Sequence, residues 1–188
     1  IYFKGVCEKD IVNTVIDYFD LDRDYNEIKR ILSKVDNNME ESIKYGEGIR
    51  ILNQDLWETI ISFIISANNN IPRIKGIIER LSKKYGKKIE FNNKKYYTFP
   101  TVEELKDVSV EEYRELGLGF RDIRLYETTK MILNKDVDIS KLNEIKDTNQ
   151  VRDELLKLSG VGPKVADCIL LFSTLKRFDV FPIDVWVR

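Results

Sequence analysis

The sequence predicts a mainly α-helical fold with one minor β-hairpin. Most segments between turn signals carry apolar residues at spacings of three and four, which places these residues on one face of a helix. The connections are short, which favours helices packed on one another over a parallel sheet with long crossovers. One stretch, Lys88 to Phe99, has strand-forming residues around Asn92-Asn93, as is typical of a tight hairpin.

The first third of the chain begins with Ile1 to Val6, which has the pattern of the end of a strand. Asp10 is the expected N-cap of a helix that ends at Tyr18, and Tyr25 to Val35 repeats the amphipathic pattern. Gln54 to Ala67 is apolar around most of its circumference. We therefore expect it to be the central, buried helix.

Turn and cap residues divide the rest of the chain into further helices. Asn68-Asn69-Asn70 ends the apolar helix, and Pro72 opens the next, because proline in a first turn needs no N–H donor. The other helices are expected over 73–85, from Thr101, over 109–116, from Phe120 to about Leu133, over 151–158 and over 164–175, and Asp184 is the expected cap of a last one.

The composition excludes several kinds of chemistry. With 188 residues and 43% hydrophobic content the chain can bury a sizeable core, and no apolar run reaches membrane-spanning length. It has no histidine, which excludes Ser-His-Asp and Cys-His nucleophiles and histidine-ligated metals. Cys7 and Cys168 lack the spacing of a zinc site, so a reducing, cytoplasmic location is expected. A net charge of -1 means that any contact with nucleic acid must be local.

The stretch LSGVGPKVADC, Leu158 to Cys168, carries the clearest chemical signal. Gly160 and Gly162 permit a left-handed turn between two helices and the close approach of another backbone. Such a turn exposes N–H groups at the start of the second helix, which is an anion site suited to a DNA phosphate. A plain turn between helices explains the glycines equally well.

Lys164 stands in the opening turn of that second helix, where a cation is disfavoured by the helix dipole. Partial burial by Val165 and Ile169 would disfavour the charged form further and make the amine a usable nucleophile near neutral pH. The alternative is an ordinary exposed lysine whose stem lies along the helix.

Asp184 is the candidate carboxylate to pair with this amine. The helix from Lys164 to Leu175 rises about 17 Å, whereas the eight residues after it can extend about 26 Å, so Asp184 can return beside Lys164. A role as helix cap is compatible with catalysis, because N–H donors would keep the carboxylate ionised.

Together these residues resemble a known family. LSGVGPKVADC followed by FPIDVW is similar to the helix-hairpin-helix, Gly/Pro-rich loop and Asp motif (HhH-GPD) of the DNA glycosylase superfamily. With SANNNIPRIKGIIERL and LGLGFR, the combination resembles the 8-oxoguanine DNA glycosylase/AP lyases from about Asp17 to Trp186. The resemblance implies a two-part helical fold of the HhH-GPD type, preceded in the whole protein by an antiparallel sheet domain.

The resemblance implies a bifunctional enzyme of base excision repair that acts on double-stranded DNA containing 8-oxoguanine opposite cytosine. Lys164 would attack C1′, displace the base, form a Schiff base and cleave the strand by β-elimination. Asp184 would stabilise the positive charge and assist proton transfer. This protein is expected to be a bacterial monomer in the cytoplasm, associated with the nucleoid and with no membrane partner.

The resemblance also assigns the residues that bind DNA. Gly160 and Gly162 would hold the backbone, and Asn68 would fill the hole left by the extruded nucleotide. Arg73 and Arg121 would contact the opposite cytosine, with Phe120 wedged beside it. Without the resemblance, Phe120 would be assigned to core packing and Arg73 to an exposed first turn.

Cys168, one turn after Lys164, resembles the residue that packs on the extruded base; alone, it would be assigned as a small buried hydrophobe. No cofactor and no iron–sulfur cluster are implied. The carbonyls of Leu156, Leu158 and Val161 resemble those that hold a structural cation at the hairpin. Trp186 departs from the pattern, since relatives carry histidine there.

The resemblance divides the chain into four parts. They are the end of a sheet domain (1–9), N-terminal helices packed on the catalytic part (10–53), a helical domain with the two DNA-contacting loops (54–137), and a catalytic part whose end is missing (138–188). Two other functions stay open, an endonuclease III-like glycosylase for oxidised pyrimidines and a non-catalytic DNA-binding module. The Lys164–Asp184 pair disfavours the module, and NNNIPRI with LGLGFR disfavours the endonuclease III type.

Overall fold

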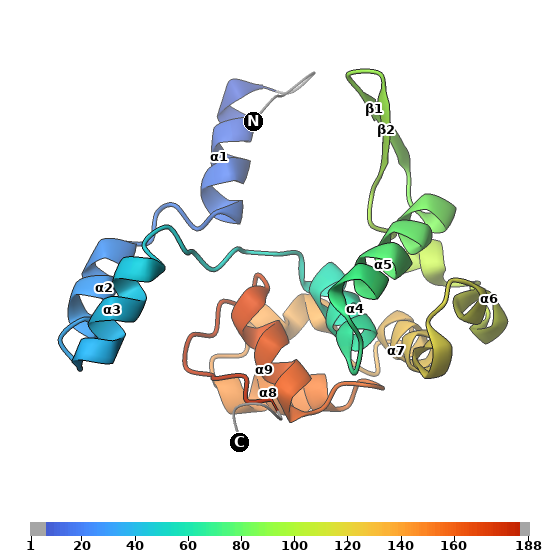
Figure 1. The fold of residues 1–188 in the computed structure, drawn as a ribbon. Helices are drawn as coiled ribbons and strands as arrows, with labels where there is room; N and C mark the ends of the chain where they lie inside the picture. Colours follow the sequence, from blue (N-terminus) through green and yellow to red (C-terminus); the bar gives the residue numbers. More distant parts are fainter. Residues whose placement is uncertain (1–6, 185–188) are drawn as a thin grey trace. The chain divides into compact units, whose positions relative to one another are not determined.

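The structure, a computed structural model, describes residues 7–184 and divides the chain into two compact units, Ile1–Asn53 and Gln54–Arg188 (Figure 1). The predicted strand end at Ile1 to Val6, the helix after Asp184 and Trp186 lie outside the described residues. No helix in the described part of the chain combines the length and apolar character needed to cross a membrane.

The described part of the first unit contains α1 (Glu8–Tyr18), α2 (Tyr25–Leu32) and α3 (Asn37–Tyr45). The prediction that Asp10 caps α1 was wrong. The helix begins at Glu8, so Asp10 lies inside its first turn, where a carboxylate stabilises the positive end of the helix dipole. The sequence analysis missed α3, which has few apolar residues to mark a face; Asp36 caps it by accepting from Met39 N at 2.8 Å.

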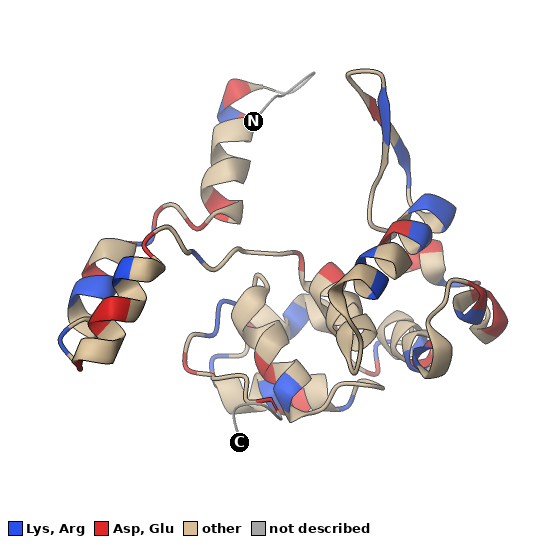
Figure 2. Cartoon of the chain, in the orientation of Figure 1, with Lys and Arg blue, Asp and Glu red and all other residues tan. Residues whose placement is uncertain are grey.

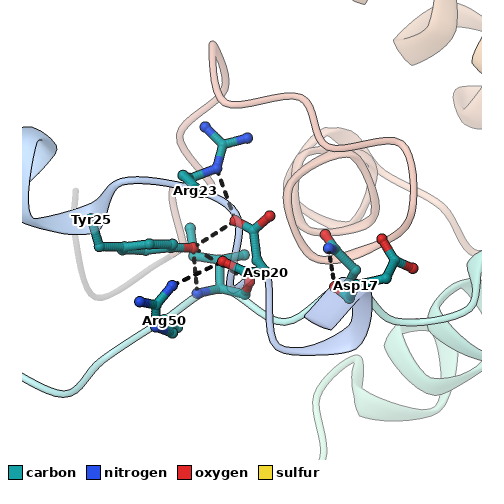
Figure 3. A network of polar contacts seen from close by, with 7 residues as sticks. Asp17, Asp20, Arg23, Tyr25 and Arg50 are labelled. Atoms are coloured by element: carbon teal, nitrogen blue, oxygen red, sulfur yellow. Dashed lines mark hydrogen bonds and ion pairs between the residues drawn. The ribbon is translucent and has the colours of Figure 1, made fainter. Parts of the chain in front are cut away.

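A polar network around Asp20 holds the turn between α1 and α2 (Figure 3). The Asp20 carboxylate accepts from Arg23 Nε at 2.8 Å and from the Tyr25 hydroxyl at 3.0 Å. The same hydroxyl accepts from Ile51 N at 3.0 Å, and Arg50 donates to the Asp20 carbonyl at 2.8 Å. Because Asp20 is 7% exposed and has φ of 51°, these contacts fix a left-handed turn that most side chains disfavour.

The second unit is built around α4 (Leu56–Ser66), which packs against α5 (Ile71–Tyr85), α7 (Asp122–Leu133) and α9 (Pro163–Phe172). Its apolar side chains are almost all buried, as the sequence predicted for a central helix. Asp55 caps α4 by accepting from Glu58 N at 2.9 Å, so the helix starts two residues later than expected. Gln54 instead pairs its backbone with Phe172 and Thr174, next to the end of α9.

The predicted hairpin is confirmed as β1 (Lys88–Phe91) paired antiparallel with β2 (Lys94–Tyr97). Asn92 and Asn93 join the strands with φ of 49° and 58°, the left-handed pair that a two-residue turn requires. The hairpin extends from the end of α5 (Figure 1). The mainly helical fold with a minor hairpin is therefore as predicted.

Several shorter elements complete the second unit. They are α6 (Val110–Glu115), α8 (Thr148–Leu156) and the 3-10 turns Glu103–Leu105, Gly119–Arg121 and Ile139–Glu144. The helix expected from Thr101 is only a 3-10 turn, whereas Ser109 forms a full capping box with Glu112 on α6. Several observed boundaries differ from their predictions by a few residues, and α9 ends at Phe172 because the chain turns there to pair with Gln54.

The Asp20 network predicts an acid-sensitive contribution to stability. Burial disfavours the ionised carboxylate, but hydrogen bonds from Tyr25 and Arg23 outweigh burial and hold the pKa of Asp20 below its usual value. This contribution is therefore complete above the unfolded-state pKa and is lost as the pH falls through the folded-state pKa. We expect Asp20→Asn to lower the free energy of unfolding by about 1–2 kcal/mol at pH 7 and by less in acid.

Urea unfolding of both proteins at pH 7 and at acidic pH values checks this prediction, with Asp22→Asn, a neighbouring aspartate, as the control. An equal loss of stability at every pH would show that the Asp20 charge is not responsible.

Candidate active site

Side chains of α7 hold the turn between α8 and α9 in place. Thr128 on α7 donates from Oγ1 to the Ser159 carbonyl at 2.8 Å, and Ser159 Oγ donates to Glu127 at 2.6 Å. Gly160 has φ of 83°, and a methyl group on it would lie 2.9 Å from Arg124 Cδ. This glycine is therefore required both by the backbone conformation and by the close approach of α7.

Gly162 differs from the prediction that both glycines supply left-handed backbone. It is extended, with φ of -98° and ψ of 179°, and caps α9 without a side chain. Apart from Gly162 itself and its two chain neighbours, no atom of the described residues lies within 4 Å of the position that a Cβ would take there. The open space lies beside the first-turn N–H groups of α9, which have no acceptor within the helix.

The start of α9 forms one wall of a pocket of about 550 Å³. Ser66, Ala67 and Asn68 enter it from the end of α4, and Phe181, Ile183 and Asp184 from the C-terminal segment; α9 contributes Pro163, Lys164, Val165 and Asp167. Three of the predicted residues, Lys164, Asp184 and Asn68, thus line the same pocket although they lie far apart in the sequence.

Lys164 is exposed, contrary to the expectation that Val165 and Ile169 would partly bury it. The reason is its place in the helix. The first turn of α9 lies at the surface, and the buried face starts only at Ala166. The amine is therefore accessible to a ligand in the pocket.

Cys168 lies beneath Lys164 and is 3% exposed. Burial raises the pKa of the Cys168 thiol, and the negative charges of Asp167 and Asp184 raise it further. The Lys164 amine acts in the opposite direction, through its positive charge and a hydrogen bond to the thiol. The thiol is thus neutral near pH 7. Lys164 and Asp184 are thus near enough to Cys168 for their charges to act on its thiol.

Asp167 is a pocket residue that the sequence analysis missed. Its carboxylate lies 2.6 Å from Arg152 Nη2, and the two side chains are 15% and 31% exposed, so a partly buried ion pair joins α8 to α9. Only its position three residues after Lys164, on nearly the same helix face, could have indicated it. The pair ties the two helices on either side of the hairpin to each other.

Two of the residues predicted to contact the opposite base are exposed. Phe120 is 52% exposed, which does not fit the core-packing alternative, and the guanidinium groups of Arg121 and Arg124 lie 4.2 and 5.2 Å from the centre of its ring. Arg73 is also exposed and donates from Nη2 to the Gly117 carbonyl at 3.0 Å.

Arg121 behaves differently, because it is only 2% exposed and its guanidinium faces inward. It donates to the carbonyls of Ala67, Asn68 and Leu118. In this structure Arg121 therefore contacts the loop that carries Asn68 and does not present its donors to a ligand.

Positive charge gathers locally and not over the whole molecule. Figure 2 shows basic and acidic residues interspersed along the helices of both units, in keeping with the net charge of -1. Three arginines nevertheless lie near one another. Burial lowers the pKa of the Arg121 guanidinium, and the positive charges of Arg73 and Arg124 lower it further. Such a cluster beside an open helix N-terminus suits a polyanion.

The cation site predicted at the carbonyls of Leu156, Leu158 and Val161 stays a prediction. The Leu158 carbonyl accepts from Val161 N at 3.1 Å within the turn. Within residues 7–184, no group of three or more acidic or cysteine side chains is arranged to hold a metal ion.

Two helices joined by a glycine hairpin, with a lysine and an aspartate in one pocket, form the arrangement expected from the helix-hairpin-helix motif. Comparison with known families agrees. Residues 61–188 match the model of the HhH-GPD superfamily base excision DNA repair proteins, and residues 2–60 match the 8-oxoguanine DNA glycosylase N-terminal domain. The chain belongs to the HhH-GPD superfamily, as its motifs indicated.

Matches to individual proteins give more detail than the family models. The chain is 46% identical to the Clostridium acetobutylicum 8-oxoguanine glycosylase/lyase in its apo form, with a TM-score of 0.91 over 97% of this chain and 63% of the other. The same Clostridium enzyme in complex with DNA containing cytosine opposite 8-oxoguanine is matched at 45% identity, with a TM-score of 0.90 over 96% and 61%.

A curated relative, the N-glycosylase/DNA lyase of Saccharomyces cerevisiae, is 40% identical over 155 residues, which are 75% of this chain and 40% of that protein. The chain thus spans less than two thirds of the length of these relatives.

The two glycines predict different effects of the same substitution on stability. Gly160→Ala should lower the free energy of unfolding by more than about 1 kcal/mol, because alanine is strained at positive φ and its methyl group meets Arg124. Gly162→Ala should change it by less than about 0.5 kcal/mol, because the backbone is extended and the space is open. Chemical denaturation of the two variants checks this, and equal losses would contradict the assigned geometry.

Proposed function

We propose that this chain forms the glycosylase and lyase part of an enzyme that excises 8-oxoguanine opposite cytosine from duplex DNA. The observation that carries the proposal is the pocket in which Lys164, Asp184 and Asn68 meet beside the open N-terminus of α9. The matches to an 8-oxoguanine glycosylase N-terminal domain and to the Clostridium enzyme support the choice of lesion.

The chemistry follows from an amine and a carboxylate in one pocket. Neutral Lys164 attacks C1′ of the damaged nucleotide, the C1′–N bond breaks, and the base leaves with a proton. The Asp184 carboxylate stabilises the positive charge that develops on the sugar ring. The C1′–O4′ bond of the sugar ring then breaks, O4′ takes a proton, and C1′ and the lysine nitrogen form a Schiff base. The Schiff base acidifies the C2′ proton, and its loss expels the 3′ phosphate by β-elimination. Lys164 supplies the covalent catalysis, so no cofactor is needed.

The reaction requires the nucleotide to leave the duplex, and the rim of the pocket suits this step. Asn68, at the pocket wall, can enter the hole left in the stack. Exposed Phe120 can wedge against the unpaired base, and exposed Arg73 carries donors that match the acceptors of cytosine.

Backbone binding is assigned to the hairpin. A phosphate fits the open space at Gly162, where the N–H groups of the first turn and the positive end of the α9 dipole converge. A structural cation held by the carbonyls of Leu156, Leu158 and Val161 would add to this contact, as the family resemblance implies. Such local contacts bind DNA without a net positive charge on the chain.

An endonuclease III-like activity on oxidised pyrimidines is the second candidate, because it would use the same lysine and aspartate. The match of residues 2–60 to the 8-oxoguanine glycosylase N-terminal domain favours the first candidate. A non-catalytic module would not need Lys164 and Asp184 in one pocket.

Borohydride trapping distinguishes the three candidates. The whole protein is incubated with duplexes that contain 8-oxoguanine opposite cytosine, thymine glycol or no lesion. A covalent complex formed only with 8-oxoguanine supports the proposal, and one formed on thymine glycol favours the second candidate. Binding without trapping on either lesion would leave a DNA-binding module.

Lys164→Gln should abolish base release and covalent trapping while it changes the affinity for duplex DNA by less than about threefold, because the lysine serves the reaction centre and not the phosphate grip. Lys157→Gln, at the end of α8 beside the same hairpin, is the matched control and should be trapped like the unmodified protein. Gel analysis of trapped complexes and a binding titration measure the two effects. Equal losses of binding and catalysis would contradict the nucleophile assignment.

Asp184→Asn should slow base release by about 100-fold or more, because it removes the charge that stabilises the transition state. The affinity for an undamaged duplex should be nearly unchanged. Single-turnover kinetics measure the first effect and a thermal melt shows whether the variant is folded. Full activity in a folded variant would exclude Asp184 from the reaction.

A further inference from the structure

We propose that a second pocket, at the opposite end of α4 from the candidate active site, binds a small organic amine, in which a protonated amino group is carried on an apolar body. The pocket has a volume of about 520 Å³, which is in the range of sites that hold small molecules. In the described part of the chain it shares no lining residue with the pocket around Lys164. The inference therefore goes beyond the proposed function and does not depend on it.

The walls of this pocket are largely apolar and are fixed by the core of the second unit. Trp57 from α4 and Ile132 from α7 line it, and each is 8% exposed. The Trp57 indole donates from Nε1 to the Pro100 carbonyl at 2.9 Å, which joins α4 to the segment that follows β2. The other apolar lining residues that pack against the same core are Phe99, Val102 and Ile139. A preformed apolar pocket favours the body of a small ligand, because binding removes apolar surface from water.

Two carboxylates at the start of α4 bring negative charge to this pocket. Asp55 is the N-cap, and its carboxylate accepts from Glu58 N at 2.9 Å. Glu58 is exposed, and among residues 7–184 no hydrogen bond or ion pair is found for its carboxylate. Burial nevertheless raises the pKa of the Glu58 carboxyl, and the negative charge of Asp55 raises it further. A cation bound beside Glu58 would oppose both effects.

The lining has two further charged residues, Asp138 and Lys135. Asp138 accepts from Ser140 N at 3.2 Å and from Ser140 Oγ at 2.5 Å, and it lies 3.5 Å from Lys141 Nζ. Lys135, just after α7, is exposed and brings one positive charge. Three carboxylates and one amine give the lining a net charge of -2 when all four groups are ionised.

This charge decides which ligands the pocket suits. The carboxylates would repel a nucleotide or the DNA backbone. Among the described residues, acidic side chains are not grouped in a way that could hold a metal ion. Capping and the helix dipole account for acidic residues at the start of α4, but neither requires an apolar pocket beside them. An amine on an apolar body suits both parts, because its charge can pair with Glu58 while its body lies against Trp57 and Ile132.

Titration of the whole protein with phenethylamine tests the site, followed by NMR at the Trp57 indole N–H, whose signal is assigned by its absence from Trp57→Phe. The signal should shift and saturate with a dissociation constant of about 1 mM or lower. Phenethyl alcohol and hydrocinnamate carry the same ring with no charge and with a negative charge, and should bind at least about fivefold more weakly. No saturable shift with the amine, or equal binding of the alcohol, would overturn the proposal.

Two variants test the assigned lining. Glu58→Gln should weaken phenethylamine binding by about fivefold or more, because an amide does not carry the paired charge. Glu111→Gln is the matched control, since Glu111 is a first-turn glutamate of α6 outside the pocket, and it should bind like the unmodified protein. Ser140→Phe places a ring in the pocket from an exposed position and should abolish binding. Unchanged binding in Glu58→Gln, or in Ser140→Phe that is folded by thermal melt, would contradict the site.

A duplex tests whether the site is separate from the DNA-binding surface. Saturation with undamaged DNA should change the dissociation constant of phenethylamine by less than about twofold, because the two pockets lie at opposite ends of α4. Displacement of the amine by the duplex would overturn the separate site. The titration of the free protein needs no DNA, so a protein that binds the amine but is not trapped on any lesion would contradict the proposed function and leave this inference standing.

Discussion

The burial of α4 is the constraint on which the second unit depends. Because its side chains are apolar on nearly every side, α5, α7 and α9 must pack around it, and this packing determines where each of their ends emerges. The C-terminal end of α4 and the N-terminal end of α9 thereby reach the same pocket. The hydrophobic burial of α4, which has no chemical role of its own, thus brings the loop that carries Asn68 beside Lys164.

Polar contacts then refine what hydrophobic packing places only approximately. The ion pair between Arg152 and Asp167 ties α8 to α9, and Thr128 and Glu127 hold the hairpin turn from α7. Arg121 does the same for the end of α4. Each of these side chains contacts backbone or a neighbouring helix, and all of them except Asp167 lie outside the lining of the pocket. Such preorganisation is what a reaction at a fixed geometry requires.

The hairpin also shows how a chain with a net charge of -1 can suit a polyanion. Backbone N–H groups and a helix dipole carry their partial charge whatever the side-chain composition is. In the proposed function they hold the phosphate, and a few arginines near the pocket complete the surface. Overall charge is therefore a poor guide to DNA binding where the backbone supplies the donors.

The sequence alone determined the helical class, the hairpin at Asn92-Asn93, the central position of α4 and the motif around Lys164, because periodicity, turn chemistry and residue spacing are local properties. It missed α3, whose apolar face is weak, and it left the boundaries uncertain by a few residues. Only the tertiary structure decided that Lys164 is exposed, that Gly160 and not Gly162 needs to be glycine, and that Arg121 turns inward. The reason is that exposure and hydrogen-bond partners depend on helices distant in the chain, which no local pattern encodes.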